Sequence, residues 1–77
     1  PKMMVGSSPA CDVELNHPSV SAYHAFIVLE GDGRLLIKDL ASENGTYVNA
    51  QKITEIHLKS GDSLKIGDCV FFVERNE

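Results

Sequence analysis

Ser21 and His24 are the two residues of this chain whose types and spacing most suggest catalysis. A serine hydroxyl next to an imidazole is the nucleophile and base pair of many hydrolases. However, the sequence has no Gly-x-Ser-x-Gly turn around Ser21, and no segment of it predicts an oxyanion hole. We therefore reject a small hydrolase and predict that the chain is not an enzyme.

The groups that bind metals do not predict a metal site. Cys11, Cys69 and the three histidines show none of the close paired spacings of zinc ligands. The aspartates stand singly at turns and strand ends rather than in the spacing of a calcium loop. Two widely separated cysteines in apolar runs are expected to be buried free thiols in a reducing compartment. No cofactor is expected.

The distribution of charge argues against nucleic acid and membrane partners. Seven Lys and Arg residues stand against eleven Asp and Glu residues, giving a net charge of −4. The basic residues are scattered and form no patch that could attract a polyanion. The apolar runs are much shorter than the ~20 residues that span a bilayer, and no signal peptide is visible. A protein or a protein segment is the expected partner.

Short β-rich runs bounded by turn residues repeat along the whole chain. Apolar residues never recur at i, i+3, i+4 and i+7 over three turns, so no helix is predicted. The segment Gly31-Asp32-Gly33 predicts a tight hairpin. Many short strands of this kind are typical of a β-sandwich or barrel. The expected strands cover 3–5, 12–15, 25–30, 34–39, 46–48, 52–53, 63–66 and 69–74.

A chain of 77 residues suits one domain, covering 1–77. At this length about 60% of the unfolded surface is buried, so the core is small. The sequence starts directly in a strand-like run and ends just after one, and we expect it to be a fragment of a larger protein. The predicted core consists of Val5, Val13, Leu15, Ile27, Leu29, Leu35, Ile37, Val48, Leu58, Leu64, Ile66, Phe71 and Val73.

Five segments follow one another in the order of a known family. They read Cys-Asp-Val-Glu-Leu at 11–15, Val-Ser-Ala-Tyr-His-Ala at 20–25, Asp-Leu-Ala-Ser-Glu-Asn-Gly-Thr-Tyr-Val-Asn at 39–49, Leu-Lys-Ser-Gly-Asp at 58–62 and Ile-Gly at 66–67. Together they resemble the forkhead-associated (FHA) domain over nearly the whole chain. The resemblance implies an all-β, FHA-like sandwich of short antiparallel strands. It also implies that the family's first strand, an edge partner that would precede Pro1, is missing.

The resemblance places a phosphothreonine-peptide pocket at Ser7, Ser21, Ala22, Glu43 and Asn44. Ser21 matches the family's phosphate-binding serine, and Asn44 matches the asparagine that holds the peptide backbone. The family has an arginine where this chain has Ser7, and commonly a second one at the position of Ala22. A dianionic phosphate needs such charge-assisted donors. Because Glu43 would also repel phosphate, the resemblance implies a degenerate domain with phosphothreonine recognition lost.

The remaining signature residues are expected to have structural roles. The resemblance makes His24 a scaffold histidine that ties the recognition loops together, whereas His17 and His57 are expected in surface loops. Turn glycines with positive φ are expected at Gly6, Gly45, Gly61 and Gly67. The full structural signature by resemblance is Gly6, His24, Gly45, Thr46 and Asn49.

Two functions remain open on this basis. The first is a phospho-independent, non-catalytic interaction module with a scaffold or assembly role. The second is a phosphothreonine reader that uses Ser7, Ser21, Asn44 and backbone N–H groups. A narrower expectation is that the chain resembles the cytoplasmic FHA-like domain of the inner-membrane-ring protein of type III secretion systems. The expected location is the cytoplasm, with a parent protein that can be anchored in a membrane.

Overall fold

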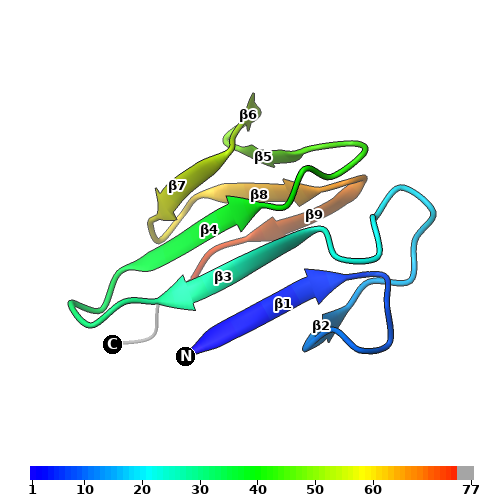
Figure 1. Ribbon diagram of the computed structural model, residues 1–77. Coiled ribbons are helices and arrows are strands. Elements are labelled where there is room, and N and C mark those ends of the chain that lie inside the picture. Colours follow the sequence, from blue (N-terminus) through cyan, green and yellow to red (C-terminus); the bar gives the residue numbers. More distant parts are fainter. Residues whose placement is uncertain (75–77) are drawn as a thin grey trace.

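The computed structural model describes residues 1–74, and every regular element in this part of the chain is a β-strand (Figure 1). No helix in these residues has the length and apolarity needed to cross a membrane. The strands are β1 (Lys2–Gly6), β2 (Val13–Glu14), β3 (Ala25–Leu29), β4 (Leu35–Asp39), β5 (Thr46–Val48), β6 (Gln51–Lys52), β7 (Glu55–Leu58), β8 (Ser63–Ile66) and β9 (Cys69–Phe72).

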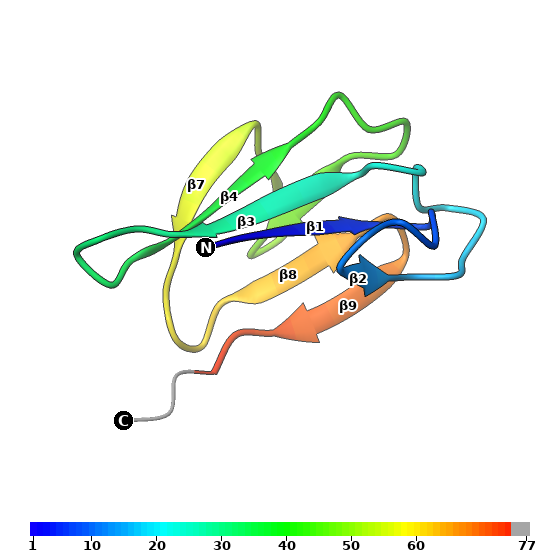
Figure 2. The same ribbon diagram turned by 60° about the horizontal axis from the view of Figure 1, so that its bottom comes forward.

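The strands form two sheets that pack face to face. The larger sheet has the order β2-β1-β3-β4-β7 and the smaller sheet the order β6-β5-β8-β9. Figure 2 shows β1 and β3 of the larger sheet lying over β8 and β9 of the smaller one. This arrangement confirms the predicted all-β sandwich.

The pairing of β1 with β2 differs from the expected antiparallel pattern. These two strands are parallel, with Val5 opposite Val13, whereas all other pairs are antiparallel in residues 1–74. The Asp12 carboxylate accepts a hydrogen bond from the Met4 N–H at 2.8 Å. The half-buried Met4 N–H lies beyond the end of the short β2 and needs another acceptor. The Asp12 carboxylate provides it.

Most turns lie where the sequence predicts them, but β7 was missed. The 31–33 hairpin forms, with the Arg34 N–H donating to the Asp32 carboxylate at 3.0 Å. Glu55–Leu58 pairs with β4 along its whole length. The sequence predicted no strand here and singled out only Leu58, as a core residue. His57 therefore lies on a strand instead of in a loop, and its Nε2 is 2.5 Å from Glu30 Oε1.

The core lies between the two sheets, and most of its predicted members are there. The predicted residues Leu29 and Phe71 are wrong, since they are 45% and 38% exposed. Leu29 ends β3, and Phe71 borders an apolar groove that opens between the sheets beside β9. His24 and Thr46 are fully buried, although the sequence did not place them in the core. The buried apolar residues are Val5, Cys11, Val20, Ala25, Ile37, Val48, Leu58, Leu64 and Ile66.

Two smaller expectations have different outcomes. Cys11 and Cys69 are free thiols, but only Cys11 is buried, and Cys69 is half-buried. Within residues 1–74, β9 has only β8 beside it. The family strand expected before Pro1 lies outside this sequence and stays a prediction.

Candidate functional site

The loops expected to form the pocket meet at one end of the sandwich, on the right in Figure 1. They are the segments 7–12, 15–24 and 40–45 together with the hairpin 67–68. Backbone hydrogen bonds join them, for example from the Ser7 N–H to the Ser21 carbonyl at 3.0 Å and from the Ser8 N–H to the Ala22 carbonyl at 3.1 Å. The chain thus brings together segments that are far apart in sequence.

His24 joins two of these loops from inside the protein. Its side chain is fully buried, Nδ1 accepts the Ser21 N–H at 3.1 Å, and Nε2 donates to the Gly45 carbonyl at 2.9 Å. These partners require the neutral tautomer with the proton on Nε2, because a peptide N–H can only donate and a carbonyl can only accept. With both ring nitrogens occupied by backbone partners, the imidazole acts as a structural tie between the loops.

Asp39 organises the 40–45 loop from the end of β4. Its carboxylate accepts the Ser42 hydroxyl at 2.5 Å, the Ser42 N–H at 3.1 Å and the Thr46 hydroxyl at 2.8 Å. Partial burial alone would raise the pKa of Asp39, but the hydrogen bonds from Ser42 and Thr46 outweigh it and lower the pKa. The Ser42 hydroxyl then accepts the Gly45 N–H at 3.0 Å, which completes the turn.

The five pocket residues expected by resemblance all lie at this end of the molecule. The Ser21 hydroxyl accepts the Glu43 N–H at 3.0 Å, and this bond links the second and third loops. Ser7 and Ser21 are half-buried, whereas Ala22, Glu43 and Asn44 are exposed. The Ser21 hydroxyl keeps its proton available for a ligand, because its oxygen acts as the acceptor in the bond to Glu43.

Ser19 is a central residue of the site that sequence reasoning missed. Its carbonyl accepts the Asn44 side-chain N–H at 2.8 Å, and its hydroxyl accepts the Asp68 N–H at 2.8 Å. The Ser19 hydroxyl donates to His17 Nδ1 at 2.6 Å. A Cβ on Gly67 would lie only 2.5 Å from the Ser19 carbonyl oxygen, so the hairpin packs directly on this residue. No feature of the sequence around Ser19 signals these contacts.

Gly6 has a different role from the one expected of it. No positive φ occurs at Gly6, whereas Gly45, Gly61 and Gly67 have φ of 84°, 92° and 57° as expected. A Cβ on Gly6 would lie 2.1 Å from the Ala22 carbonyl oxygen. Glycine is therefore required here for the close approach of two backbones.

Asn49, the last signature residue, lies away from the loop end. Its amide donates to Asp62 Oδ1 at 3.0 Å and accepts the Ser63 N–H at 3.0 Å, at the far end of β5. Asn49 has φ of 50°, a conformation that asparagine tolerates better than most residues. The residue thus fixes the β5–β6 turn against the 59–62 turn and does not contact the pocket loops.

The pocket loops and the strand ends beside them are acidic and contain no Lys or Arg. Residues 6–24, 39–45 and 67–68 include no Lys or Arg, and they carry the carboxylates of Asp12, Glu14, Asp39, Glu43 and Asp68. One cation approaches from outside, since Lys52 Cε on β6 lies 3.1 Å from the position that a Cβ on Gly45 would take. Within residues 1–74, no group of three or more His, Cys, Asp or Glu side chains is arranged to hold a metal ion.

Comparison with known proteins gives the same family at three levels. A family model described as FHA domain matches residues 3–67. The glycogen accumulation regulator GarA of Mycolicibacterium smegmatis is 39% identical over 67 residues, which are 87% of this chain and 42% of the regulator. The chain therefore spans less than half the length of that curated relative.

Two solved structures superimpose on nearly the whole chain. The FHA domain of the protein CT664 from Chlamydia trachomatis has a TM-score of 0.94 and 32% identity, over 100% of this chain and 78% of that one. A second structure has a TM-score of 0.92 and 29% identity. Its description reads "structural and functional analysis of phosphothreonine-dependent FHA domain interactions". It covers 99% of this chain and 78% of that one.

Proposed function

The chain belongs to the FHA domain family, and from this we propose that it is a non-catalytic protein-interaction module in which phosphothreonine recognition is lost. The observation that carries the proposal is the charge of the loop end. Ser7 and Ala22 stand where the family supplies arginines, and residues 6–24, 39–45 and 67–68 contain no Lys or Arg. The loop scaffold around His24 and Asp39 is nevertheless complete.

The energy of a phosphate contact supports this proposal. A hydrogen bond to a charged group contributes about 1.5–3 kcal/mol, so the absence of a bidentate arginine lowers affinity at least ~10-fold to 100-fold. Glu43 adds repulsion, because its side chain is exposed beside Asn44 in the third loop. A scaffold or assembly role in which the partner is unphosphorylated fits such a surface better than a phosphate reader does.

A second candidate is a surviving phosphothreonine reader. Ser21 and Asn44 lie in adjacent loops, and Lys52 passes beside Gly45 and could supply one cation. The chain is also similar to a solved structure whose description names phosphothreonine-dependent FHA domain interactions. This function predicts phosphate-dependent binding that weakens when Lys52 is replaced by Met.

Calorimetry with phosphothreonine peptides and their unphosphorylated forms tests the proposal. The wild-type domain is expected to bind both forms equally, and a low-micromolar, phosphate-dependent interaction would overturn the proposed loss. Ser7→Arg is expected to raise phosphopeptide affinity about tenfold or more by restoring one charged donor. Glu43→Thr in the same variant should raise it further. Ser60→Arg is the matched control, because it adds the same charge at the 59–62 turn, away from these loops.

A narrower proposal concerns the parent protein. The missing arginine and the acidic charge are the features that support a cytoplasmic, FHA-like domain of a type III secretion inner-membrane-ring protein. The full-length sequence tests this proposal directly. A membrane-spanning helix after the domain is expected, and a kinase or transcription-factor domain in the same chain would exclude it.

A further inference from the structure

Four residues form a straight row across the outer face of the smaller sheet. Lys52 on β6 is opposite Tyr47 on β5, Tyr47 is opposite Lys65 on β8, and Lys65 is opposite Val70 on β9. We call these four residues the cross-sheet row. Their chain neighbours Val48, Leu64 and Ile66 are buried between the sheets. Because side chains alternate along a strand, the cross-sheet row faces away from the core.

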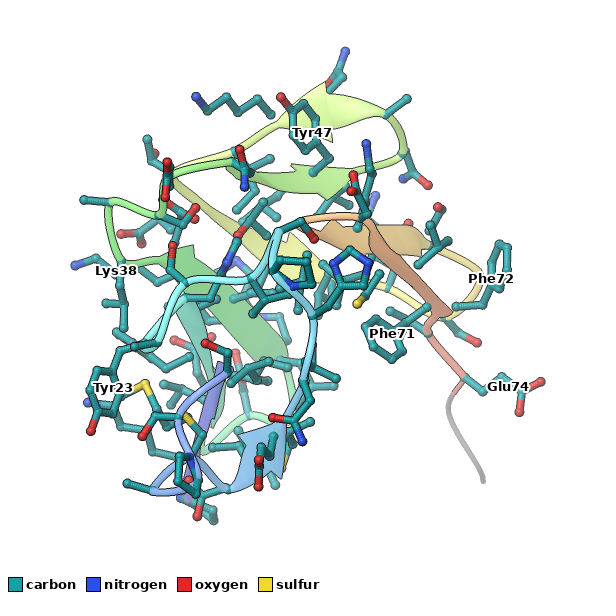
Figure 3. All side chains as sticks on the ribbon, turned by 90° about the vertical axis from the view of Figure 1, so that its right-hand side faces the viewer. Tyr23, Lys38, Tyr47, Phe71, Phe72 and Glu74 are labelled. Atoms are coloured by element: carbon teal, nitrogen blue, oxygen red, sulfur yellow. The ribbon has the colours of Figure 1, made fainter. Side chains whose placement is uncertain are left out.

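This outer face is more apolar than the solvent side of an antiparallel sheet usually is. Val70 is 55% exposed, and Phe72, two residues further along β9, is 75% exposed. Figure 3 shows Tyr47 and Phe72 on the outer side of the smaller sheet, with Tyr23 and Lys38 on the other side of the molecule. Exposed apolar side chains that lie together on a soluble domain mark an interaction site.

The row also carries two ammonium groups without carboxylate partners. Lys65 Nζ lies 5.3 Å from the centre of the Tyr47 ring. Among residues 1–74, the ion pairs involve neither Lys52 nor Lys65. The cross-sheet row thus presents positive charge on a protein whose net charge is −4. A partner that covers this row has to bring carboxylates opposite the two lysines.

We propose that the cross-sheet row is a docking surface for an acidic amphipathic helix of a partner protein. Adjacent strands are ~4.8 Å apart, so the Cα atoms that carry the cation, the aromatic ring, the second cation and the apolar group follow one another at about that interval. One turn of an α-helix advances 5.4 Å, and a helix with Glu, Leu, Glu and Leu at i, i+4, i+7 and i+11 offers the complementary order at a similar interval. An extended peptide is a poorer match, because residues on one of its faces are ~6.6 Å apart and the residues of the row are ~4.8 Å apart. By the fourth residue the two series no longer coincide.

Other occupants fit the row less well. A second copy of this domain offers no helix within residues 1–74. An anionic membrane is normally recognised by clusters of about four to eight basic residues, and the row has two lysines. The row is on a sheet face, although its Lys52 side chain also passes beside Gly45 at the loop end. The inference goes beyond the proposed function, because Tyr47, Lys65 and Val70 lie outside the pocket loops.

In the first experiment the ¹⁵N-labelled domain is titrated with a helical peptide of eighteen residues. The peptide has Glu, Leu, Glu and Leu at i, i+4, i+7 and i+11, and its other residues are Ala and Gln. The expected result is saturable amide shifts at Tyr47, Lys65 and Val70. A control peptide has the same composition, but its glutamates and leucines are placed on opposite helix faces, and it is expected to cause no saturable shift. Equal binding of the two peptides, or shifts centred on the 40–45 loop, would overturn the proposal.

Charge and apolar contacts are then separated with variants of the domain. Lys65→Glu is expected to weaken the binding of the first peptide about two- to fivefold, as is typical of an exposed ion pair. Lys38→Glu makes the same charge change on the other sheet and should leave the affinity unchanged. Val70→Thr should weaken binding while the melting temperature stays within error. An equal effect of Lys38→Glu and Lys65→Glu, or no effect of either Lys65→Glu or Val70→Thr, would contradict the inference.

Discussion

At the scale of single residues, His24 is the buried histidine that ties two loops of the loop end together. It is fully buried and bonds the backbone of two loops through Ser21 and Gly45. His24→Ala removes both bonds. It leaves the Ser21 N–H without a partner and the Gly45 carbonyl with only the long bond from the Gly67 N–H at 3.4 Å. We expect the free energy of unfolding to fall by about 1–3 kcal/mol.

Thermal unfolding followed by circular dichroism measures this effect. For a domain of this size, each kcal/mol corresponds to about 4–8 °C in melting temperature. His17→Ala is the control, because His17 is exposed and the groups it leaves can bond to water. A melting temperature of His24→Ala equal to that of His17→Ala would show that the buried bonds contribute little.

Asp39 makes the stability of the domain depend on pH. Its pKa is lowered in the folded state, where hydrogen bonds from Ser42 and Thr46 outweigh the effect of burial. The carboxylate therefore stabilises the fold above its unfolded pKa of about 3.9, and this contribution disappears as the pH falls through the lower folded value. Asp39→Asn should lower stability at pH 7, and the difference from wild type should shrink below about pH 4.

Urea denaturation from pH 7 to pH 2.5 checks this prediction. Asp12→Asn serves as the comparison, because Asp12 is exposed and bonds the β1 edge outside the Asp39 network. A stability difference between Asp39→Asn and wild type that stays constant over the whole range would contradict the role of the ionised carboxylate.

At the scale of elements, Gly6 joins β1 to the first pocket loop at a point where two backbones approach closely. An added Cβ would lie 2.1 Å from the Ala22 carbonyl oxygen, a distance that forces the backbone to move. Gly6→Ala should destabilise the domain by about 1–3 kcal/mol, as overpacking typically does. It should also shift the amide signals of the loop 15–24.

Gly31 offers a matched control for this substitution. A Cβ on Gly31 would have no atom within 4 Å, and Gly31 is not among the residues with positive φ. Gly31→Ala should therefore be neutral or slightly stabilising, since it restricts the unfolded chain. The prediction fails if chemical denaturation gives the two variants the same midpoint.

At the scale of the whole molecule, the β9 side of the sandwich is the least protected. β9 is an edge strand within residues 1–74, and its Val70, Phe71 and Phe72 are 55%, 38% and 75% exposed. Exposed apolar edge strands pair with other chains, and charged residues on an edge prevent this. Phe72→Lys should therefore reduce concentration-dependent association of the domain.

Static light scattering over a concentration series measures this association. Tyr23→Lys adds the same charge at another exposed aromatic residue, which lies at the loop end. Edge pairing predicts that Phe72→Lys lowers the apparent mass at high concentration and that Tyr23→Lys does not. If both variants lower it equally, net charge and not the strand edge controls association.

The sequence alone determined the features that depend on local chemistry. Alternating residues and turn glycines gave eight of the strands, and the 31–33 hairpin follows from Gly-Asp-Gly. The order of the family segments predicted the sandwich and the gathering of Ser7, Ser21 and Asn44 at one end. The lack of Lys and Arg in the pocket loops is likewise a property of the sequence.

Only the tertiary structure decided which contacts and surfaces result. Alternation indicates that Phe71 and Phe72 point to opposite sides of β9, but not how far the opposite sheet extends over Phe71. The parallel pairing of β1 with β2 and the contacts of Ser19 also arise between distant segments. The physical reason is that burial and hydrogen-bond partners depend on what the rest of the chain places against a residue. Neighbours along the sequence do not carry that information.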